Sequence, residues 1–238
     1  MTAPFALSLQ DLAPIADGTS TAQAMAETIA LAQEADRLGY TRLWYAEHHG
    51  MPSIASSVPE ILIASAAAHT RSIRVGSGGV MLLKTNIASL KGVAAMNAAF
   101  RAAAPDLLPL ITLDQEGGAV ERLTRDVGFK EIPSAADIAA SKSPQEAEAI
   151  YTEMAKSIAA LGFTVNFGPV ADVNLNSNNQ VIARFGRAYS ADPARVAAYD
   201  AAFIAGHRAA GLLTALKHFP GHGSSTADSH EGFVDISK

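Results

Sequence analysis

Leu212-Leu213-Thr214-Ala215-Leu216-Lys217-His218-Phe219-Pro220-Gly221-His222-Gly223 joins a short apolar run to two basic residues and a glycine-rich segment. The apolar part, residues 212–216, predicts a strand. Pro220 and the two glycines that flank His222 disfavour regular structure, so we expect a loop at the carboxyl end of this strand. In a parallel α/β sheet, loops at this end carry the active site.

Similar apolar runs alternate with capped helices along the chain. Ser20 and Gln23 form a capping-box pattern before a helix expected over residues 21–38. Ser143-Pro144-Gln145-Glu146 gives the same signal, with proline at the first helical position. This alternation predicts βα units around a parallel sheet. The other expected strands are residues 4–9, 41–46, 73–83, 108–113 and 163–167.

These units predict an α/β fold, a TIM-barrel-like (βα) repeat with a parallel sheet. About six units can be counted, whereas a closed barrel of this type has about eight, so we expect an incomplete barrel. We expect residues 1–238 to form a single domain. An incomplete parallel sheet exposes apolar edges, which predicts a homo-oligomer that covers them. The alternative is a closed barrel with fewer units.

The composition is that of a globular protein, because 49% of the 238 residues are hydrophobic and 17% are charged. The formal net charge of −5 and the lack of a basic run argue against a nucleic-acid partner. Without cysteine, the chain has no disulfide and no thiol chemistry. Residues 1–10 do not form a signal peptide pattern, and no apolar run is long enough to span a bilayer. We therefore expect a cytoplasmic protein with no membrane partner.

Asp228 and His230 lie two residues apart, so on an extended segment their side chains point to the same side. A carboxylate beside an imidazole fixes its tautomer and stabilises the imidazolium, which suits proton transfer near neutral pH. The histidines of this segment could instead belong to a metal site, which would need further ligands, or to a solvated loop. We expect no metal.

Three further motifs precede this segment in the chain. They are Asp114-Gln115-Glu116-Gly117-Gly118 with Val120 and Arg122, Asn166-Phe167-Gly168-Pro169-Val170 with Asp172-Val173, and Phe185-Gly186-Arg187-Ala188-Tyr189-Ser190. Together with Lys217 to Gly223 and Asp228-Ser229-His230, they make residues 80–238 resemble glycoside hydrolase family 3, in its β-N-acetylglucosaminidase branch. The resemblance implies an amino-sugar glycoside as the ligand.

The resemblance also implies which residues bind the sugar. Arginine and lysine donate hydrogen bonds to hydroxyl and acetamido oxygens, and aspartate accepts them from hydroxyls. The alternatives are that the aspartate caps the following helix and that the arginines are surface charges. The residues that match the sugar-binding positions of the family are Asp114, Arg122, Arg187, Lys217 and His218.

For catalysis, the resemblance assigns His230 as general acid/base and Asp228 as its orienting partner. The nucleophilic aspartate of the family lies on a later strand, and no aspartate of this chain matches its motif. Asp235 lies too near His230 to take that place. We therefore expect hydrolysis to be weak or absent.

The first third of the chain carries different motifs. Ser8 to Pro14, Gly39 to Met51 with Trp44-Tyr45-Ala46-Glu47-His48-His49, and Ile73 to Leu82 make residues 4–82 resemble the bacterial luciferase-like flavin monooxygenases. Both families are (βα)8 barrels, and residues 78–83 suit either of them. We infer a fusion seam inside this strand, with segments 1–82 and 83–238. The alternative is one family that has drifted at its N-terminus.

The second resemblance implies a remnant of a flavin pocket at His48, His49 and Gly78. Luciferase-like enzymes hold the flavin phosphate on later strands of the barrel, which are replaced here, so we expect little or no FMN binding and no other cofactor. The sequence thus predicts a chimeric, engineered protein with a partial β-N-acetylglucosaminidase-like site. The alternatives are a scaffold without activity and a flavin-dependent monooxygenase.

Overall fold

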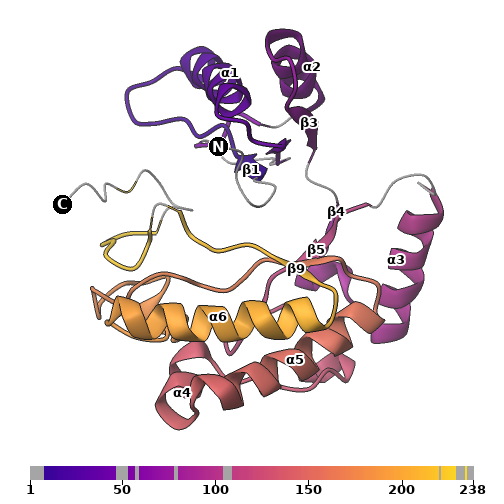
Figure 1. The fold of residues 1–238 in the computed structure, drawn as a ribbon, viewed down its shortest axis with the longest axis vertical. Helices are drawn as coiled ribbons and strands as arrows, with labels where there is room; N and C mark the ends of the chain where they lie inside the picture. Colours follow the sequence, from indigo (N-terminus) through magenta and orange to yellow (C-terminus); the bar gives the residue numbers. More distant parts are fainter. Residues whose placement is uncertain are drawn as a thin grey trace. The chain divides into compact units, whose positions relative to one another are not determined.

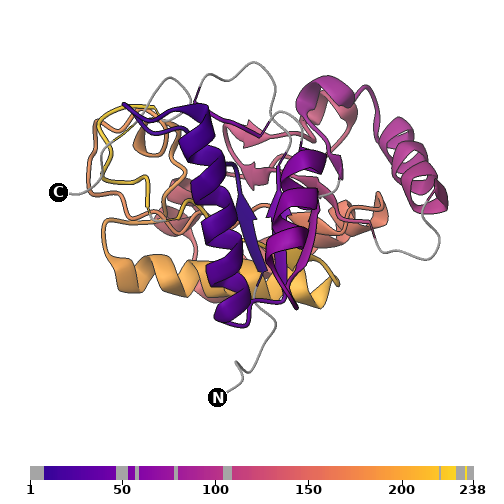
Figure 2. The same ribbon diagram turned by 90° about the horizontal axis from the view of Figure 1, so that it is seen from above.

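The structure is a computed structural model of the chain. It describes residues 8–46, 53–56, 59–77, 80–103, 109–219, 221–228 and 234. The chain divides into two compact units, Met1–Gly78 and Gly79–Lys238. Each unit contains a parallel sheet of its own, and Figures 1 and 2 show them from two directions.

The first unit is a three-stranded parallel sheet with two connecting helices. Its strands follow chain order, β1 (Ser8–Asp11), β2 (Arg42–Tyr45) and β3 (Arg74–Ser77). The helices α1 (Thr21–Arg37) and α2 (Pro59–His69) lie side by side (Figures 1 and 2). The core of this unit is formed by Ala13, Ala32, Ala35, Leu43, Tyr45, Leu62, Ala66 and Ile73.

The second unit contains a four-stranded parallel sheet in the order β4-β5-β8-β9. These strands are Val80–Met81, Ile111–Leu113, Val165–Asn166 and Leu213–Thr214. Its helices are α3 (Leu90–Ala103), α4 (Ala135–Ser141), α5 (Pro144–Ala160) and α6 (Pro193–Ala209). An antiparallel ribbon, β6 (Gln115–Gly117) and β7 (Val120–Glu121), follows β5 directly, and the short 3-10 helices are Lys84–Asn86, Arg125–Val127 and Ala183–Phe185.

The close packing of α5 on α6 organises the core of the second unit (Figure 1). A Cβ atom at Gly206 of α6 would lie 2.8 Å from the backbone nitrogen of Thr152 in α5, so only glycine allows this approach. Beside the contact, the rings of Tyr151 and Phe203 meet with centroids 4.8 Å apart. The small side of α6 at Gly206 thereby allows the two helices to pack at close range.

The predicted helix starts are confirmed. Ser20 and Gln23 form the capping box of α1, and Ser143 and Glu146 form that of α5, with Pro144 in the first turn. Among the described helices, none combines the length and the apolar character that a membrane crossing requires. A cytoplasmic location stays a prediction.

The predicted strand over residues 73–83 is wrong in one respect, because two strands occupy it. β3 pairs with β2 in the first unit, and β4 pairs with β5 in the second. Gly78 and Gly79 separate them in the sequence, and glycine weakens a strand interior. The α/β fold with parallel sheets is confirmed. The single domain over residues 1–238 and the closure of the sheet stay predictions.

Candidate functional site

Parallel strands deliver the site residues to one edge of the second sheet. The register aligns Leu113 of β5 with Asn166 of β8, and Asn166 with Thr214 of β9. Asp114 follows β5 directly, and Lys217 lies three residues beyond β9. Their side chains meet, with 2.7 Å between Lys217 Nζ and Asp114 Oδ1, although 103 positions separate them in the sequence.

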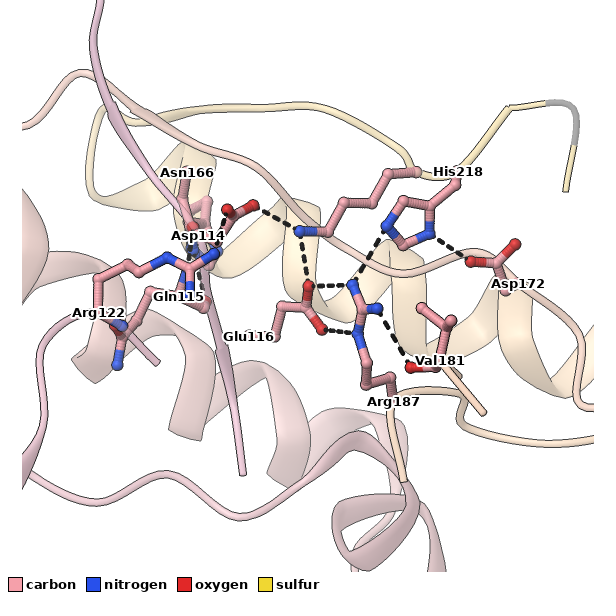
Figure 3. Close-up of polar contacts among 11 residues, drawn as sticks. Asp114, Gln115, Glu116, Arg122, Asn166, Asp172, Val181, Arg187 and His218 are labelled. Atoms are coloured by element: carbon pink, nitrogen blue, oxygen red, sulfur yellow. Dashed lines mark hydrogen bonds and ion pairs between the residues drawn. The ribbon is translucent and has the colours of Figure 1, made fainter. Parts of the chain in front are cut away.

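The same lysine joins two carboxylates. Lys217 Nζ lies 2.6 Å from Glu116 Oε1 as well as 2.7 Å from Asp114 Oδ1. On the other side of the aspartate, Arg122 Nη2 donates to Asp114 Oδ2 at 2.8 Å. Figure 3 shows this chain of alternating charges. Each acid is therefore compensated by more than one hydrogen bond.

Glu116 contacts Arg187 as well as Lys217. Arg187 Nε donates to Glu116 Oε2 at 2.8 Å, and Nη2 donates to Oε1 at 2.7 Å. The two side chains are only 10% and 8% exposed, so the pair is shielded from water. A bidentate pair of this kind fixes the plane of the guanidinium.

His218 lies between Arg187 and a third acid, Asp172, as Figure 3 shows. Arg187 Nη2 donates to His218 Nε2 at 3.1 Å, and His218 Nδ1 lies 2.6 Å from Asp172 Oδ2. A guanidinium can only donate, so Nε2 must accept and the ring proton must sit on Nδ1. The hydrogen bonds therefore orient the ring, with Nε2 accepting from Arg187 and Nδ1 donating to Asp172.

Burial and charge compete at all three carboxylates. Burial alone would raise the pKa of Asp114, but Lys217 and Arg122 outweigh it and bring the pKa below its ordinary value. The pKa of Glu116 is lowered in the same way against burial, by Arg187 and Lys217. Burial also opposes ionisation of Asp172, yet its hydrogen bonds from His218 and from the His222 backbone lower its pKa. All three acids are thus ionised at neutral pH.

Buried polar side chains, Gln115, Asn166 and His207, form a hydrogen-bonded layer next to the cluster. Gln115 Oε1 accepts hydrogen bonds from the backbone nitrogens of Arg122 and Leu123, both at 3.0 Å, and so fixes the β6–β7 ribbon. Asn166 Oδ1 accepts from the Gln115 backbone nitrogen at 2.9 Å, and Asn166 Nδ2 donates to His207 Nε2 at 2.9 Å. This layer ties the ribbon that carries Arg122 to β8 and α6.

A second group of polar contacts joins two loops of the same unit. Asn179 Nδ2 donates to the hydroxyl oxygen of Ser225 at 2.8 Å and to the backbone oxygen of His222 at 2.8 Å. Asn176 Nδ2 donates to the Ser225 backbone oxygen at 2.8 Å. Next to these contacts lies a cavity of about 450 Å³, lined by Gln180, Arg184, Phe185, Thr226, Ala227 and Asp228.

The structure brings together five of the residues that the sequence singled out. Asp114 does not serve as a helix cap, and neither arginine is a free surface charge, because all three belong to the ionic cluster. Asp228 lines the cavity beside the second loop. The residues His48, His49, Gly78 and His230 lie outside the described part of the chain. The five clustered residues are Asp114, Arg122, Arg187, Lys217 and His218.

Sequence reasoning missed Glu116 and Asp172 as members of the site. Glu116 lies two positions after Asp114, a spacing that places two side chains on one side of an extended segment, and this signal could have identified it. Asp172 gave no such local signal, since its partner His218 is 46 positions away.

The cluster offers what a polyhydroxylated ligand needs. Lysine and arginine nitrogens are donors, and ionised carboxylates are acceptors, so both directions of a hydroxyl hydrogen bond can be satisfied. Within the described ranges, His, Asp and Glu side chains form no group of three that could hold a metal ion. The geometry therefore favours recognition of hydroxyl groups.

Comparison with known proteins agrees with both resemblances seen in the sequence. The model of the glycosyl hydrolase family 3 N-terminal domain matches residues 63–238. The model of the luciferase-like monooxygenases matches residues 6–100, so the two matches overlap around the division between the units.

Individual relatives match about two thirds of the chain or more. A beta-hexosaminidase of Stenotrophomonas maltophilia (strain R551-3) is 43% identical over 158 residues, which cover 64% of this chain and 45% of that protein. The structure of NagZ from Neisseria gonorrhoeae in complex with N-trifluoroacetyl-D-glucosamine matches with a TM-score of 0.60 and 27% identity, over 66% of this chain and 47% of that one.

A third relative is a family 3 β-N-acetylglucosaminidase from Paenibacillus sp. str. FPU-7. Its structure matches with a TM-score of 0.61 and 29% identity, over 82% of this chain and 34% of that one. The chain thus spans less than half the length of the relatives described here.

Proposed function

Because the chain belongs to glycosyl hydrolase family 3, whose N-terminal domain matches residues 63–238, we propose that its ionic cluster binds the amino sugar of a β-N-acetylglucosaminide. The observation that carries the proposal is that Asp114, which follows β5, meets the adjacent residues Lys217 and His218, which follow β9, at one edge of the sheet. Relatives named as beta-hexosaminidases, and one solved with N-trifluoroacetyl-D-glucosamine, support this class of ligand.

The individual roles follow from charge and geometry. Lys217 and the two arginines, Arg122 and Arg187, donate to sugar hydroxyl and acetamido oxygens, and Asp114 accepts from hydroxyls. His218, with Nε2 directed at Arg187, helps to position that guanidinium. We assign His230 as the general acid/base and Asp228 as its orienting partner.

We propose that hydrolysis by this polypeptide is weak or absent. A retaining mechanism needs a carboxylate that is free to attack the sugar. The three clustered acids of the described region, Asp114, Glu116 and Asp172, are each held by cationic or histidine partners. Their hydrogen bonds would have to break before any of them could act as a nucleophile.

Calorimetric titration with N-acetylglucosamine tests the binding proposal. We expect saturable binding by the wild-type chain and a loss of about tenfold or more in Lys217→Met, because a hydrogen bond to a charged group contributes about 1.5–3 kcal/mol. Lys156→Met is the matched control, since Lys156 lies on the exposed surface of α5 and pairs only with Glu153 among the described residues. Equal loss in both variants would contradict the proposal.

Turnover is tested separately with a chromogenic N-acetylglucosaminide. We expect a rate close to that of the uncatalysed reaction, and any enzymatic turnover must disappear in His230→Ala. Brisk turnover by the wild-type chain would refute the assignment of a site that binds without attacking. Turnover that survives His230→Ala would refute the acid/base role.

We propose that FMN binding is weak or absent as well. The luciferase-like match ends at residue 100, before β5, so most of the second sheet resembles the other family. Titration of FMN with the protein, followed by flavin fluorescence, checks this proposal. Saturable quenching at micromolar protein would contradict it and favour a flavin-dependent oxidoreductase.

We further propose an artificial fusion of the two families and an association of the chain into a homo-oligomer. The overlap of the two family matches around Gly78 supports the fusion.

Exposure of Leu213 on β9, the last strand in the order of its sheet, supports the oligomer. The same junction found in genomic DNA would contradict the first proposal, and a stable monomer in light scattering would contradict the second.

A further inference from the structure

The sheet of the first unit has two faces of different character. Successive residues of a strand point to opposite faces, and Leu43 and Tyr45 of β2 lie in the core with residues of α1 and α2. Both helices lie on that side of the strands (Figures 1 and 2). The residues that alternate with the core positions make up the other face, which we name the arginine face. They are Ser8, Gln10, Arg42, Trp44, Arg74 and Gly76.

An indole ring lies in the middle of the arginine face. The register places Gln10, Trp44 and Gly76 in one row across the three strands. A Cβ atom at Gly76 would lie 3.1 Å from Trp44 Cζ3 and 3.4 Å from Cε3, so the glycine leaves room for the ring to lie over β3. Trp44 is half-buried, and the remaining part of the ring offers a flat apolar surface to solvent.

Two arginines stand side by side in the neighbouring row. The register aligns Arg42 of β2 with Arg74 of β3, and adjacent strands lie about 4.8 Å apart. Counting the described ranges alone, neither guanidinium has an ion pair or a hydrogen bond. Like charges at paired positions of a sheet repel each other. An anion bound between the two arginines would remove this repulsion.

We propose that the arginine face binds an acidic saccharide, with a sugar ring on Trp44 and its carboxylate on Arg42 and Arg74. A guanidinium binds a carboxylate through two parallel hydrogen bonds, and the C–H side of a pyranose ring packs on an aromatic surface. The exposed side chains of Ser8 and Gln10 can exchange hydrogen bonds with the sugar hydroxyls. The inference goes beyond the proposed function, because it concerns the first unit by itself.

Charge favours a saccharide over a nucleic acid as the occupant. Single-stranded nucleic acid would also stack a base on an indole and place a phosphate on an arginine. Binding of that kind depends on a groove of many cations, because each phosphate carries a charge. The arginine face offers two cations in a chain with a net charge of −5. A short saccharide with a carboxylate matches this charge better.

The fluorescence of Trp44 reports directly on this face, because it is the single tryptophan of the 238 residues. Titration of the full chain with trigalacturonic acid should change the emission saturably. The neutral methyl ester of the same trisaccharide is the matched ligand, and we expect the acid to bind about fivefold more tightly than the ester. In the double variant Arg42→Gln/Arg74→Gln, the acid should bind no better than the ester.

Three further variants separate this face from other sites of the chain. Arg37→Gln loses the same charge from an exposed position on α1 and should bind both ligands as the wild-type chain does. Gly76→Ala keeps both arginines of the face but crowds the indole, so both ligands should bind more weakly. Lys217→Met alters the proposed sugar site of the second unit and should leave the emission titration unchanged.

Several results would overturn the proposal. One is binding, seen by calorimetry, that leaves the emission of Trp44 unchanged, and another is equal affinity of the wild-type chain for acid and ester. A preference for the acid that persists in Arg42→Gln/Arg74→Gln would also overturn it. Loss of binding in Lys217→Met would place the saccharide in the second unit instead. Tighter binding of a thymidylate trinucleotide than of trigalacturonic acid would assign the face to nucleic acid.

Discussion

Glu116 holds Arg187 through two hydrogen bonds, from Nε at 2.8 Å and from Nη2 at 2.7 Å. The same guanidinium nitrogen, Nη2, reaches His218 Nε2 at 3.1 Å. The carboxylate therefore sets the position of the arginine, and the arginine sets the tautomer of the histidine. Since Lys217 Nζ also lies 2.6 Å from Glu116, this one acid organises three of the five clustered residues.

Glu116→Gln is expected to weaken both the fold and sugar binding. The amide cannot balance two buried cations, and removal of one partner of a buried ion pair costs about 3 kcal/mol or more. We expect N-acetylglucosamine affinity to fall about tenfold, measured by titration, with the free energy of unfolding measured in urea. Glu153→Gln, which removes an exposed pair with Lys156 on α5, should cost less than about 0.5 kcal/mol. Equal losses of affinity and of unfolding free energy in the two variants would contradict this role of Glu116.

Asp200 should make the protein less stable as the pH rises. Burial and then the charge of Asp172 raise the pKa of Asp200 to about 7, against an ordinary value of 3.8. Within the described part of the chain, its buried Oδ1 atom finds no hydrogen-bond partner. The folded state therefore holds a proton that the unfolded state has lost between these two pKa values. The resulting loss of stability is absent below pH 3.8, grows as the pH rises and is complete above about 7.

Asp200→Asn removes this titration. We expect the variant to gain stability relative to the wild-type chain between pH 4 and pH 8, by at most about 4 kcal/mol. Urea unfolding at several pH values measures the gain. If the free energies of unfolding of the variant and the wild-type chain differ by the same amount at every pH in this range, Asp200 is ionised in the folded protein.

His207 should make the protein less stable as the pH falls, which is the opposite of the effect of Asp200. Its Nε2 atom accepts from Asn166, its Nδ1 atom donates to the Phe203 backbone oxygen at 2.8 Å, and burial lowers its pKa from 6.5 to about 4. Because the folded state excludes a proton that the unfolded state binds, this contribution is present above pH 6.5 and is lost as the pH falls toward 4. The free energy of unfolding falls by about 3 kcal/mol through this titration.

His207→Gln tests this contribution by its slope. The variant should be less stable at pH 7, because glutamine cannot reproduce the stacking on Phe203, whose ring centre lies 4.0 Å away. Its stability should nevertheless change less than that of the wild-type chain between pH 7 and pH 4. An acid-induced loss as steep as in the wild-type chain would show that another group causes it.

Local signals predicted the helices well, whereas long-range pairing was less visible. Ser20 with Gln23 and Ser143 with Glu146 mark helix starts through contacts three residues apart, so the sequence alone reveals them. The meeting of Asp114 with Lys217 could be predicted because both follow strands of one parallel sheet. The partner of Glu116 could not, since its pairing with Arg187 spans 71 positions and depends on the β6–β7 ribbon, which was not predicted.

The two units have separate apolar cores, which predicts separate unfolding. Leu43 is fully buried in the core of the first unit, and Leu113 is fully buried in the core of the second. We expect calorimetry to show two transitions. Leu43→Ala should lower the midpoint of one and Leu113→Ala that of the other, each through a loss of about 2–5 kcal/mol. A single transition shifted equally by both variants would show that the units unfold together.

The pairing of β4 with β5, and not with β3, means that the strands and loops that carry the ionic cluster all come after Gly78. The first 78 residues therefore contribute no residue to that cluster. Other β-α-β-α-β modules could be joined at this point while every residue of the ionic cluster is kept.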